Sequence, residues 1–564
     1  MTQPAKKTSD TPQVNASNDS SSKSSSHSPE DVNKLIKGRQ SREIVVGLCG
    51  PIGSELHGIS NQVYQILESE GYEVVEIRVS KQILAFSQKT STEDNKAVRY
   101  NALMDIGNDL RKAHGDAICA NHAINAINRA REQAAQEAET SATKKDEDKN
   151  DDIHRYNKQI ALKKRAYIIN QLKHPDEVKA LKGLYRGMFY LVGILCDERR
   201  RLTSLTSEGI EHKDAQDLIL RDKKENSNFG QQLEKTMLSA DLFINNSDPN
   251  SSSTAHLFSR FLKLIHGQHG ITPTKQEIGM YSAYSASMQS ACLSRQVGAA
   301  IFDKFGNSLA VGRNDVPKYG GGLYSEDDHI TPQSKDYRCI HRDQRCHNDM
   351  HKLILKGKIT EQLNIKAKEN VESIMELLSE SKTEEEKNAI RAGIIEILNN
   401  DKTADNIYKK TPIKNLIEYS RAIHAEMDAL MSLTRSNRAI EEGSILYTTT
   451  YPCHNCARHI IASGIEKVIY IEPYEKSLAI KLHDDALCHS TGENKVHLIP
   501  FQGVSPRRYQ IFFSNTSPEK ASDGRVIISD KHKQYPLDDE FVDSYIEQET
   551  FVSVSIEALK NPQK

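Results

Sequence analysis

Hydrophobic and polar residues follow several distinct patterns along the chain. The first forty residues are rich in Ser and nearly free of large apolar side chains. Such a segment cannot offset the entropy lost on ordering, so we expect residues 1–40 to be a disordered tail. An apolar run from Ile44 to Leu48 then leads through a Gly/Pro turn into ISNQVYQILESEG, which YEVVEIRVS follows. This order predicts a strand, an amphipathic helix and a second strand.

Further along, SADLFINNSD is an apolar run that ends in polar residues, and TAHLFSRFLKLI has the apolar spacing of an amphipathic helix. Together with the first elements, these segments predict an α/β domain over residues 41–270. Residues 132–165 within it are charged and rich in Ala. We expect them to form an exposed helical insertion.

A second α/β domain is predicted over residues 271–520, and a C-terminal extension over residues 521–564. Two apolar runs, Val297–Phe302 and Ser308–Gly312, flank a Gly/Asn turn and predict a hairpin. Later, SILYTTTYPCHNCARHIIASGIEKVIYIE predicts strand, turn, helix and strand. A charged block over residues 352–410 interrupts this domain, and the spacing in VESIMELL and AIRAGIIEIL predicts a helical hairpin or lid.

Length and charge narrow the classes of function. A chain of 564 residues is long enough for at least two domains. Its 75 Lys and Arg against 77 Asp and Glu leave a net charge of -2, so no strong basic field exists to hold a polyanion, and nucleic acid is disfavoured as the main substrate. No apolar run approaches the roughly 18 residues of a membrane helix. The polar start lacks the apolar region of a signal peptide, so we expect a cytoplasmic protein with reduced cysteines and no membrane partner.

The residues with the clearest chemistry lie in RAIHAEMDALM and in the Pro-Cys-x-x-Cys turn. His424 is predicted in the first turn of one helix, and Cys453 and Cys456 at the N-terminus of another. The positive end of a helix dipole favours the thiolates that zinc requires. One nitrogen and two sulfurs leave the fourth tetrahedral position open to water, which distinguishes a catalytic zinc from a closed structural one. Hydroxide formed at that position near neutral pH can attack an aromatic carbon that bears an amino group.

This reaction also needs a group that carries protons, and Glu426, two residues after His424, is placed for that role. His-x-Glu followed by Pro-Cys-x-x-Cys is the signature of the zinc deaminases. His-Ala-Glu alone would be an ordinary helix start, and Pro-Cys-x-x-Cys alone would also fit a redox or structural zinc motif. The two motifs together, in this order, favour the deaminase interpretation.

Residues 280–513 resemble the deoxycytidylate deaminases in LSRQVGAAIFDKFGNSLAVGRNDVP, RAIHAEMDALM and LYTTTYPCHNCARHIIASGIEKVIYIEPY. The resemblance implies a cytidine deaminase-like α/β/α domain with a five-stranded mixed sheet, and it assigns substrate binding to Asn314. Arg295, next to Ser294 at the start of the hairpin, is suited to bidentate contact with a phosphate. The alternatives are a turn-stabilising Asn at position 314 and an ordinary surface Arg at position 295.

GLCGPIGSELHG lies between a predicted strand and a predicted helix, as a phosphate-binding loop would, with Gly50, Gly53 and Ser54 as its phosphate-facing residues. The usual Gly-Lys-Ser/Thr ending is absent, and Glu55, Leu56 and His57 take its place. Kinase or NTPase turnover is therefore doubtful. RDKKENSNFGQQLEKTMLSADLFINN resembles the lid and next strand of nucleotide kinases, so we expect a degenerate P-loop nucleotide-kinase-like three-layer domain with a regulatory or structural role.

The combination of these two domains resembles the bacterial antiphage deoxycytidylate deaminases. That resemblance implies that the chain converts dCTP and dCMP to dUTP and dUMP, releases ammonia and starves phage DNA synthesis. It also implies a homo-oligomer and allows a regulatory nucleotide or an inhibitory RNA as a partner. Two other classes stay open: a deaminase of cytosine or adenosine in RNA or single-stranded DNA, and a non-enzymatic, regulated interaction protein.

A second metal site is predicted in DYRCIHRDQRCHNDMHK, where soft thiolates and imidazoles are closely spaced. Some deoxycytidylate deaminases hold a second zinc, which supports a structural zinc here. A polar, His-rich loop without metal is the alternative. The residues that we expect to supply ligands are Cys292, Cys339, His341, Cys346 and His347, with His351 close by.

Overall fold

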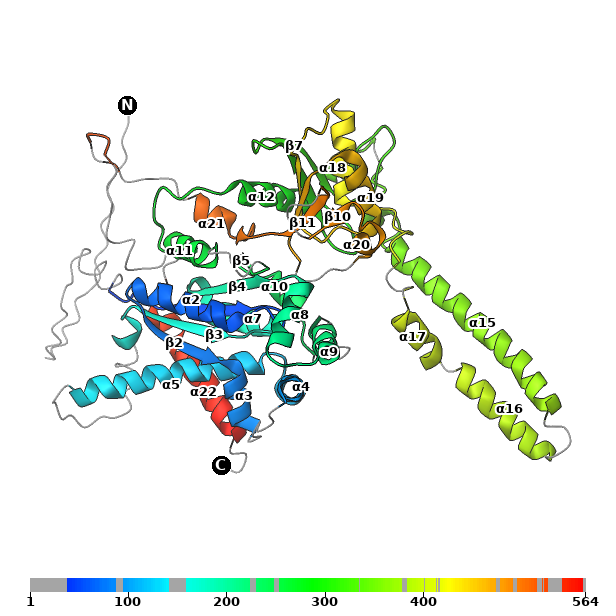
Figure 1. Cartoon of the computed structure of the whole chain (residues 1–564), viewed down its shortest axis with the longest axis horizontal. Helices are drawn as coiled ribbons and strands as arrows, with labels where there is room; N and C mark the ends of the chain where they lie inside the picture. The colour runs from blue at the N-terminus through cyan, green and yellow to red at the C-terminus, as the bar shows by residue number, and fades with distance from the viewer. Residues whose placement is uncertain are drawn as a thin grey trace, which may run out of the picture.

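The apolar run at residue 44 forms the central strand of a six-stranded sheet in the computed structural model (Figure 1). The strand order is β12-β5-β4-β1-β3-β2, and every strand is parallel to its neighbour except β12. Central parallel strands are buried on both faces, which explains why the sequence shows a continuous apolar run here. The strands are β1 (Ile44–Cys49), β2 (Glu73–Arg78), β3 (Arg165–Asn170), β4 (Phe189–Leu195), β5 (Leu242–Asn245) and β12 (Gly503–Val504).

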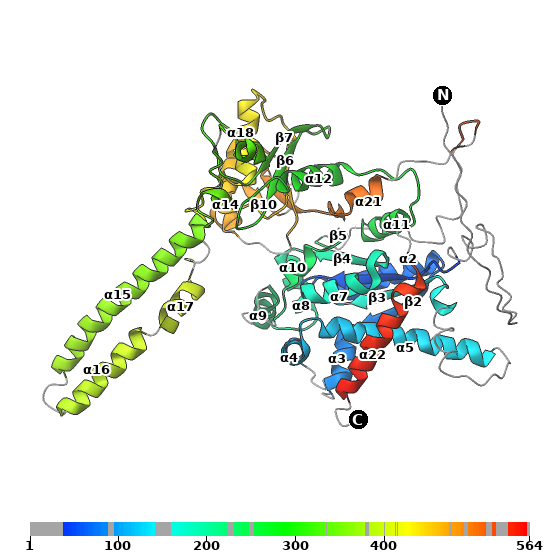
Figure 2. The same cartoon turned by 180° about the vertical axis from the view of Figure 1, so that it is seen from behind.

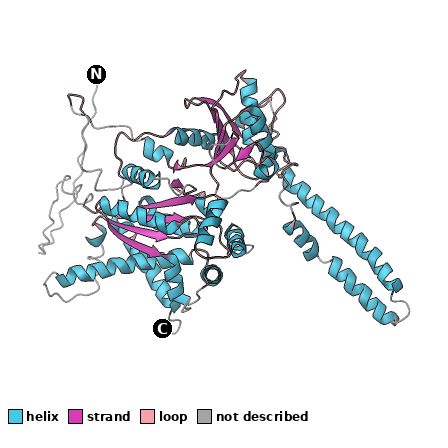
Figure 3. Ribbon diagram, in the orientation of Figure 1, coloured by secondary structure: helices cyan, strands magenta, loops and turns pink. Residues whose placement is uncertain are grey.

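Helices cover both faces of this sheet, so the first domain has three layers (Figure 3). Val46 and Leu48 pack under α2, α11 and α21, whereas Val45 and Cys49 face α5 and α7. The helices of this domain are α2 (Leu56–Ser69), α3 (Val79–Ser87), α4 (Lys96–His114), α5 (Ile118–Ser141), α7 (Pro175–Tyr185), α8 (Glu198–Ser207), α9 (His212–Lys223), α10 (Leu233–Met237), α11 (Ser253–Ile265), α21 (Tyr509–Phe513) and α22 (Ile546–Lys560).

A second sheet has the strand order β10-β11-β9-β8-β6-β7. Strand β6 is antiparallel to β7 and β8, and the remaining neighbours are parallel. The sheet has six strands, whereas the resemblance to the deoxycytidylate deaminases implies five, because the two-residue strand β10 extends its edge. The strands are β6 (Gly298–Phe302), β7 (Ser308–Arg313), β8 (Ile445–Thr448), β9 (Lys467–Tyr470), β10 (Leu487–Cys488) and β11 (Val496–Pro500).

The second domain is also an α/β/α sandwich. Ala300 and Phe302 of β6 face α12, and Ala299 and Ile301 face α18 and α19 on the other side. Three helices, α15, α16 and α17, form a long arm that projects away from both domains (Figure 1). The helices are α12 (Lys275–Ser287), α13 (Glu326–Ile330), α14 (Cys339–Arg342), α15 (His347–Leu377), α16 (Glu384–Asn399), α17 (Asp401–Lys410), α18 (Ala425–Arg435), α19 (His454–Ser463) and α20 (Ala479–Leu482).

The chain returns to the first domain after it completes the second one. Strand β12 pairs with β5, and α22 lies across α5 (Figure 2). Residues 503–513 therefore pack with the first domain, although the sequence analysis assigns them to the second. Likewise, α22 belongs to the predicted C-terminal extension, yet it covers the first domain.

Glu277 and Asp241, both buried, hold this returning segment. Glu277 accepts hydrogen bonds from the Val504 N–H (2.8 Å) and from Arg260 of α11. Asp241 accepts one from the Leu191 N–H and another from Arg508 (2.8 Å each). The two domains are therefore connected by side chains as well as by the backbone.

The structure describes most of the chain. Residues 1–37 of the predicted tail and residues 142–158 of the predicted insertion lie outside the described part. At the end of the predicted tail, Gln40 instead forms a β-bridge with Phe541. Ile160 and Ala161, near the end of the predicted exposed insertion, are instead buried, and Ala161 belongs to the core cluster that contains Val45. None of the described helices is long and apolar enough to span a membrane. The described residues are 38–87, 95–141, 159–223, 230–247, 253–333, 335–377, 383–399, 401–411, 413, 416–472, 477–489, 494–514, 520, 522–525 and 540–560.

Candidate active site

Two helix N-termini meet at the residues that the sequence analysis selects as zinc ligands. His424 is the N-cap residue of α18, and its side chain makes no capping hydrogen bond, so the imidazole is free to serve as a ligand. Cys453 is the N-cap residue of α19, and its Sγ accepts a hydrogen bond from the Cys456 N–H (3.4 Å). Both thiols therefore lie at the positive end of a helix dipole.

The three side chains converge on one point. His424 Nδ1 lies 3.3 Å from Cys453 Sγ and 3.4 Å from Cys456 Sγ. Ligand atoms around one tetrahedral zinc are separated by roughly 3.5–3.8 Å, given Zn–S near 2.3 Å and Zn–N near 2.0 Å. The one-nitrogen, two-sulfur set therefore fits a zinc ion that keeps one coordination position for another ligand.

The thiols have strongly altered acidity. Donation from the Cys456 thiol, followed by interaction with His424, lowers the pKa of Cys453. A hydrogen bond with Cys453 raises the pKa of His424, which indicates a site that favours a thiolate next to a cation. This electrostatic environment is the one that a metal cation stabilises.

Glu426 lies directly beside this cluster. Its Oε2 accepts a hydrogen bond from the Cys456 thiol at 3.5 Å, and its side chain is 3% exposed. Burial raises the pKa of Glu426. A raised pKa makes the protonated form of the carboxyl group easier to reach, which suits a group that must accept and then deliver a proton.

Gly312 fixes the position of α18 against the hairpin. A Cβ at this residue would lie 2.3 Å from the Ala429 N and 2.4 Å from the Ala425 O. Only glycine allows the helix backbone to approach β7 this closely. Because His424 and Glu426 begin this helix, the close approach also fixes their distance from the hairpin.

Arg295 lies at the exposed edge of the site. Its guanidinium donates to Glu472 Oε1 at 2.9 Å, and its side chain is 47% exposed, whereas Glu472 is buried. The second oxygen of Glu472 accepts a hydrogen bond from the Tyr451 N–H (2.7 Å), two residues before Cys453. Glu472 therefore couples Arg295 to the turn that presents the thiols. Sequence reasoning missed it, since its only signal is a carboxylate just after strand β9.

Asn314 is buried and engaged with the backbone. Its Oδ1 accepts from the Val297 N–H (2.7 Å), and its Nδ2 donates to the Arg295 carbonyl (2.8 Å). This geometry is that of the turn-stabilising alternative, so the substrate contact of Asn314 stays a prediction. Its neighbour Asp315, also missed, is buried and accepts hydrogen bonds from the Ala291 and Val316 N–H groups (2.9 and 2.8 Å).

Four of the residues predicted to bind a second metal line one cavity of about 20 Å³: Cys292, Cys339, Cys346 and His347. Ser294 lies there too, with its hydroxyl 3.5 Å from Cys346 Sγ, and its contact with substrate stays a prediction. His341 lies apart, stacked on His329 and 3.5 Å from Asp336. Among the described residues, the ligand atoms of this second group converge less closely than those of His424, Cys453 and Cys456.

The predicted phosphate loop lies in the other domain. Ser54 lines a cavity of about 640 Å³ with Gly53, whose φ is +79°. Gly50 is tightly packed, because an added Cβ would lie 2.9 Å from the Ile194 Cβ, and its carbonyl accepts a hydrogen bond from Lys173 (2.9 Å). The predicted phosphate loop and the cysteine and histidine cluster therefore lie in different domains, and the loop lines a cavity of its own.

Comparison with known proteins bears on the second domain. The family model for the cytidine and deoxycytidylate deaminase zinc-binding region matches residues 368–472. The deoxycytidylate deaminase of Enterobacteria phage T2 is 44% identical over 55 residues, 10% of this chain and 29% of that protein. ComE operon protein 2 of Bacillus subtilis is 39% identical over 56 residues, again 10% and 29% of the two chains. The chain therefore matches less than a third of the length of these relatives.

Among solved structures, a dCMP deaminase from the cyanophage S-TIM5, determined with dCMP and dUMP, is similar with 18% identity and a TM-score of 0.20. The match covers 41% of this chain and 99% of that one. The family match includes His424, Glu426, Cys453 and Cys456. Residues 368–472 of this chain are therefore similar to the zinc-binding region of the cytidine and deoxycytidylate deaminases.

Proposed function

We propose that this protein is a zinc-dependent deaminase that hydrolyses the amino group of deoxycytidine nucleotides, dCMP and dCTP. The observation that carries the proposal is the convergence of His424, Cys453 and Cys456, with buried Glu426 in contact with one of the thiols. The reaction consumes water and the cytosine nucleotide and yields the uracil nucleotide and ammonia. The deaminase zinc-binding region over residues 368–472 supports this reaction class.

The protein residues have distinct roles in this proposal. His424, Cys453 and Cys456 would hold a zinc ion, which would supply Lewis acidity and make bound water nucleophilic near neutral pH. Glu426 accepts a proton from the attacking water, delivers it to the ring nitrogen and assists departure of ammonia. Its burial favours this cycle, because a raised pKa keeps the protonated carboxyl accessible during turnover.

Recognition of a phosphate is assigned to Arg295. Glu472 engages one side of the guanidinium, and nearly half of the side chain is exposed. A guanidinium has five N–H donors, so the remaining donors are available for a phosphate. This residue favours nucleotides over the free nucleoside as substrates.

The use of dCTP as well as dCMP, and a role in depleting deoxycytidine nucleotides during phage infection, rest on the resemblance of the two-domain layout to the antiphage enzymes. In this proposal, removal of both nucleotides limits DNA synthesis. The first domain contributes regulation, and a nucleotide or an RNA is the expected signal.

We also propose a structural zinc held by Cys292, Cys339, Cys346 and His347. Their common cavity of about 20 Å³ is large enough for a single ion, and three sulfurs with one nitrogen would close a tetrahedral site. A metal count gives two zinc ions per chain in this case, and Cys346→Ala reduces it to one. A count of one in the unchanged protein would remove the second site.

The experiment that tests the main proposal is ammonia release with product identification on dCMP, dCTP, CMP, CTP, deoxycytidine and a short cytosine-containing DNA, together with a zinc count. Formation of dUMP and dUTP with little product from the ribonucleotides or the DNA is expected. Turnover of the DNA in preference to free nucleotides would replace the proposal with the nucleic-acid alternative. Zinc-loaded protein inert on every substrate would contradict it in favour of an interaction protein.

A further inference from the structure

A cavity that the deaminase chemistry does not use lies in the first domain. It measures about 640 Å³, within the range of small-molecule binding sites. The cavity opens at the carboxyl ends of β1, β2 and β3, where the chain leaves β1 for the outer strand β2 before it returns through β3. Open parallel sheets bind ligands at this kind of position.

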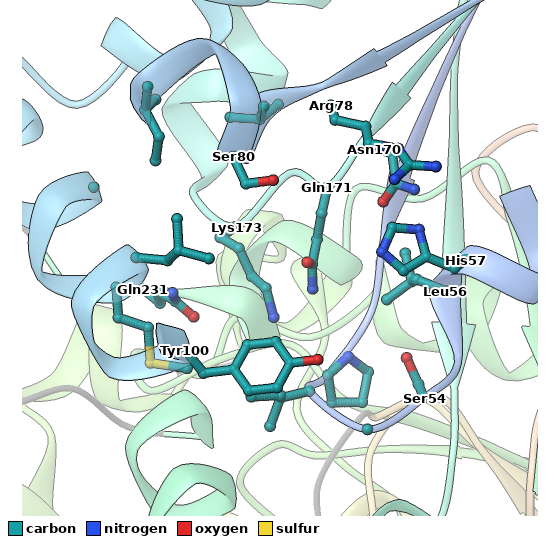
Figure 4. A pocket seen from close by; sticks show the side chains of 18 of the residues that line it. Ser54, Leu56, His57, Arg78, Ser80, Tyr100, Asn170, Gln171, Lys173 and Gln231 are labelled. Carbon is teal, nitrogen blue, oxygen red and sulfur yellow. The ribbon is translucent and has the colours of Figure 1, made fainter. Parts of the chain in front are cut away.

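One wall of the cavity is built to receive an anion. The N-terminus of the 14-residue helix α2 lies there, and no side chain caps it. Ser54, just before this helix, is 1% exposed, and its hydroxyl has no hydrogen-bond partner among the described residues. Figure 4 shows Ser54 at the edge of the same space as Tyr100, Gln171 and Lys173. A buried hydroxyl without a partner costs free energy, which a bound acceptor would recover.

The loop before α2 is held rigidly. Lys173 donates to the Gly50 carbonyl (2.9 Å) and to Asp222 (2.8 Å). The other oxygen of Asp222 accepts from the Ile52 N–H at 2.7 Å. The buried Lys173–Asp222 pair therefore fixes the loop before any ligand arrives, which reduces the entropy lost on binding.

Charge in the cavity favours a phosphate despite three lining carboxylates. Glu55, which stands where the motif has its second Gly, pairs with Arg200 at 2.6 Å, and Glu177 pairs with Arg111 at 2.7 Å. Glu208 accepts a hydrogen bond from Tyr100 (3.1 Å). The carboxylates are thus engaged by protein groups, while Arg99 adds an exposed cation to the lining.

The rest of the lining suits a base. Val79, Ile83 and Leu103 offer apolar surface, and the amides of Asn170 and Gln171 offer both donors and acceptors. We propose that this cavity binds a nucleoside phosphate, with its phosphate on the Ser54 hydroxyl and the first N–H groups of α2. The nucleotide is bound without phosphoryl transfer, because Leu56 and His57 stand where a transfer site would place its Lys and Ser/Thr.

The test is titration calorimetry on the full chain carrying Glu426→Gln, which avoids turnover. The probes are ATP, GMP and dTMP, compared with ribose 5-phosphate and inorganic phosphate. None of these carries the cytosine that the deaminase site is proposed to take, so the result is independent of the deaminase proposal. One nucleoside phosphate per chain should saturate the site, with clearly tighter binding than either base-free probe.

Two variants assign the binding to this cavity. Ser54→Ala should weaken it about 10-fold, because one hydrogen bond to a charged group is lost, while folding is retained since the hydroxyl has no protein partner. Ser69→Ala, at the opposite end of α2, is the matched control and should not change affinity. Arg99→Ala should weaken nucleotide binding without changing the stability of the protein, because the Arg99 side chain is exposed.

Three results would overturn the proposal: no saturation by any nucleoside phosphate at millimolar concentration, inorganic phosphate binding as tightly as the nucleotides, or identical affinities for the Ser54→Ala and Ser69→Ala proteins. Loss of nucleotide binding in Arg295→Ala would also overturn it, because the ligand would then occupy the deaminase domain.

Discussion

Substitution of Glu426 tests the proposed proton transfer separately from zinc binding, because Glu426 contacts Cys456 but is not one of the three proposed zinc ligands. Glu426→Gln should keep the zinc and reduce turnover of dCMP at least about 100-fold, since proton transfer is lost. Cys453→Ala is the companion variant and should lose both zinc and activity. Metal analysis and ammonia release on the same preparations check both statements. Normal activity of Glu426→Gln would remove the carboxyl group from the mechanism.

Arg295 tests whether the phosphate is recognised. Arg295→Ala should raise KM for dCMP about 10-fold or more and leave KM for deoxycytidine nearly unchanged, since one charge-assisted contact disappears. The zinc content of the variant serves as a control, because Glu472 also holds the Tyr451 N–H near the thiols. Equal changes in KM for nucleotide and nucleoside would show that Arg295 only supports the turn.

His266 makes the stability of the first domain depend on pH. Burial lowers the pKa of His266 to about 4, and its ring nitrogen lies 2.6 Å from the Tyr72 hydroxyl. Between about pH 6.5 and pH 4 the unfolded chain binds the extra proton, so this contribution is complete above pH 6.5 and is lost as pH falls through 4. It amounts to at most about 3 kcal/mol.

Denaturant unfolding at pH 7 and pH 4.5 measures this effect. His266→Gln, which retains an acceptor for Tyr72, should have a smaller loss of stability between the two pH values than the unchanged protein. His256→Gln, on the exposed side of α11, is the control and should keep the original difference. The same pH dependence in both variants would rule out His266 as its source.

At the residue scale, the sequence predicts those site residues whose partners are close along the chain. Spacing alone places Cys453 and Cys456 on one helix turn, and Glu426 follows His424 by two residues. The Arg295–Glu472 contact joins residues 177 positions apart and has no local pattern. The contact of Asn314 with the Arg295 carbonyl joins residues 19 positions apart and likewise has no local pattern.

At the scale of elements, the contact between α18 and β7 supports the site. Gly312→Ala should destabilise the second domain by about 1–3 kcal/mol and reduce zinc content, because the new methyl group meets backbone atoms that cannot move independently. Gly357→Ala is the matched control in the exposed arm helix α15, where no atom lies within 4 Å of the added Cβ. It should be neutral or stabilising by up to about 1 kcal/mol. Thermal unfolding and metal analysis compare the two.

The sequence predicts the helices and strands that have a clear hydrophobic pattern, and it does not predict the shortest strands. The runs at Ile44 and Val297 correspond to β1 and β6, and the charged block over residues 352–410 contains α16, α17 and all but the first turn of α15. Strands β10 and β12 have two residues each, too few to show any alternation. Their existence depends on neighbouring strands that supply hydrogen-bond partners, which is a property of the assembled sheet.

At the scale of the whole molecule, α22 is joined to the first domain by a buried charge cluster. Arg131 of α5 donates to Glu43 (2.7 Å) and to Glu549 of α22, and all three side chains are essentially unexposed. Glu549→Ala should lower the free energy of unfolding by about 3–5 kcal/mol, because it leaves the buried guanidinium with one partner fewer.

Glu557→Ala provides the control on the same helix. Its partner is Arg129, and both side chains are about half exposed, so the loss should be under about 1 kcal/mol. Calorimetric unfolding distinguishes the two variants, and zinc content should be unchanged in both, since the second domain is not altered. Similar losses for the two substitutions would mean that burial of the cluster contributes little.

The packing of α22 on α5 affects how the protein folds during its synthesis on the ribosome. Residues 41–247 are synthesised first, yet Arg131 has no Glu549 and the sheet edge at β5 has no β12 until more than 250 further residues have been added. Domains generally fold as units during synthesis, N-terminal parts first. The order of completion is reversed here: the second sheet has all its strands by residue 500, while the first domain still lacks its last strand and helix. A nascent chain stalled before residue 540 would therefore expose the first domain, rather than the second, to proteases and chaperones.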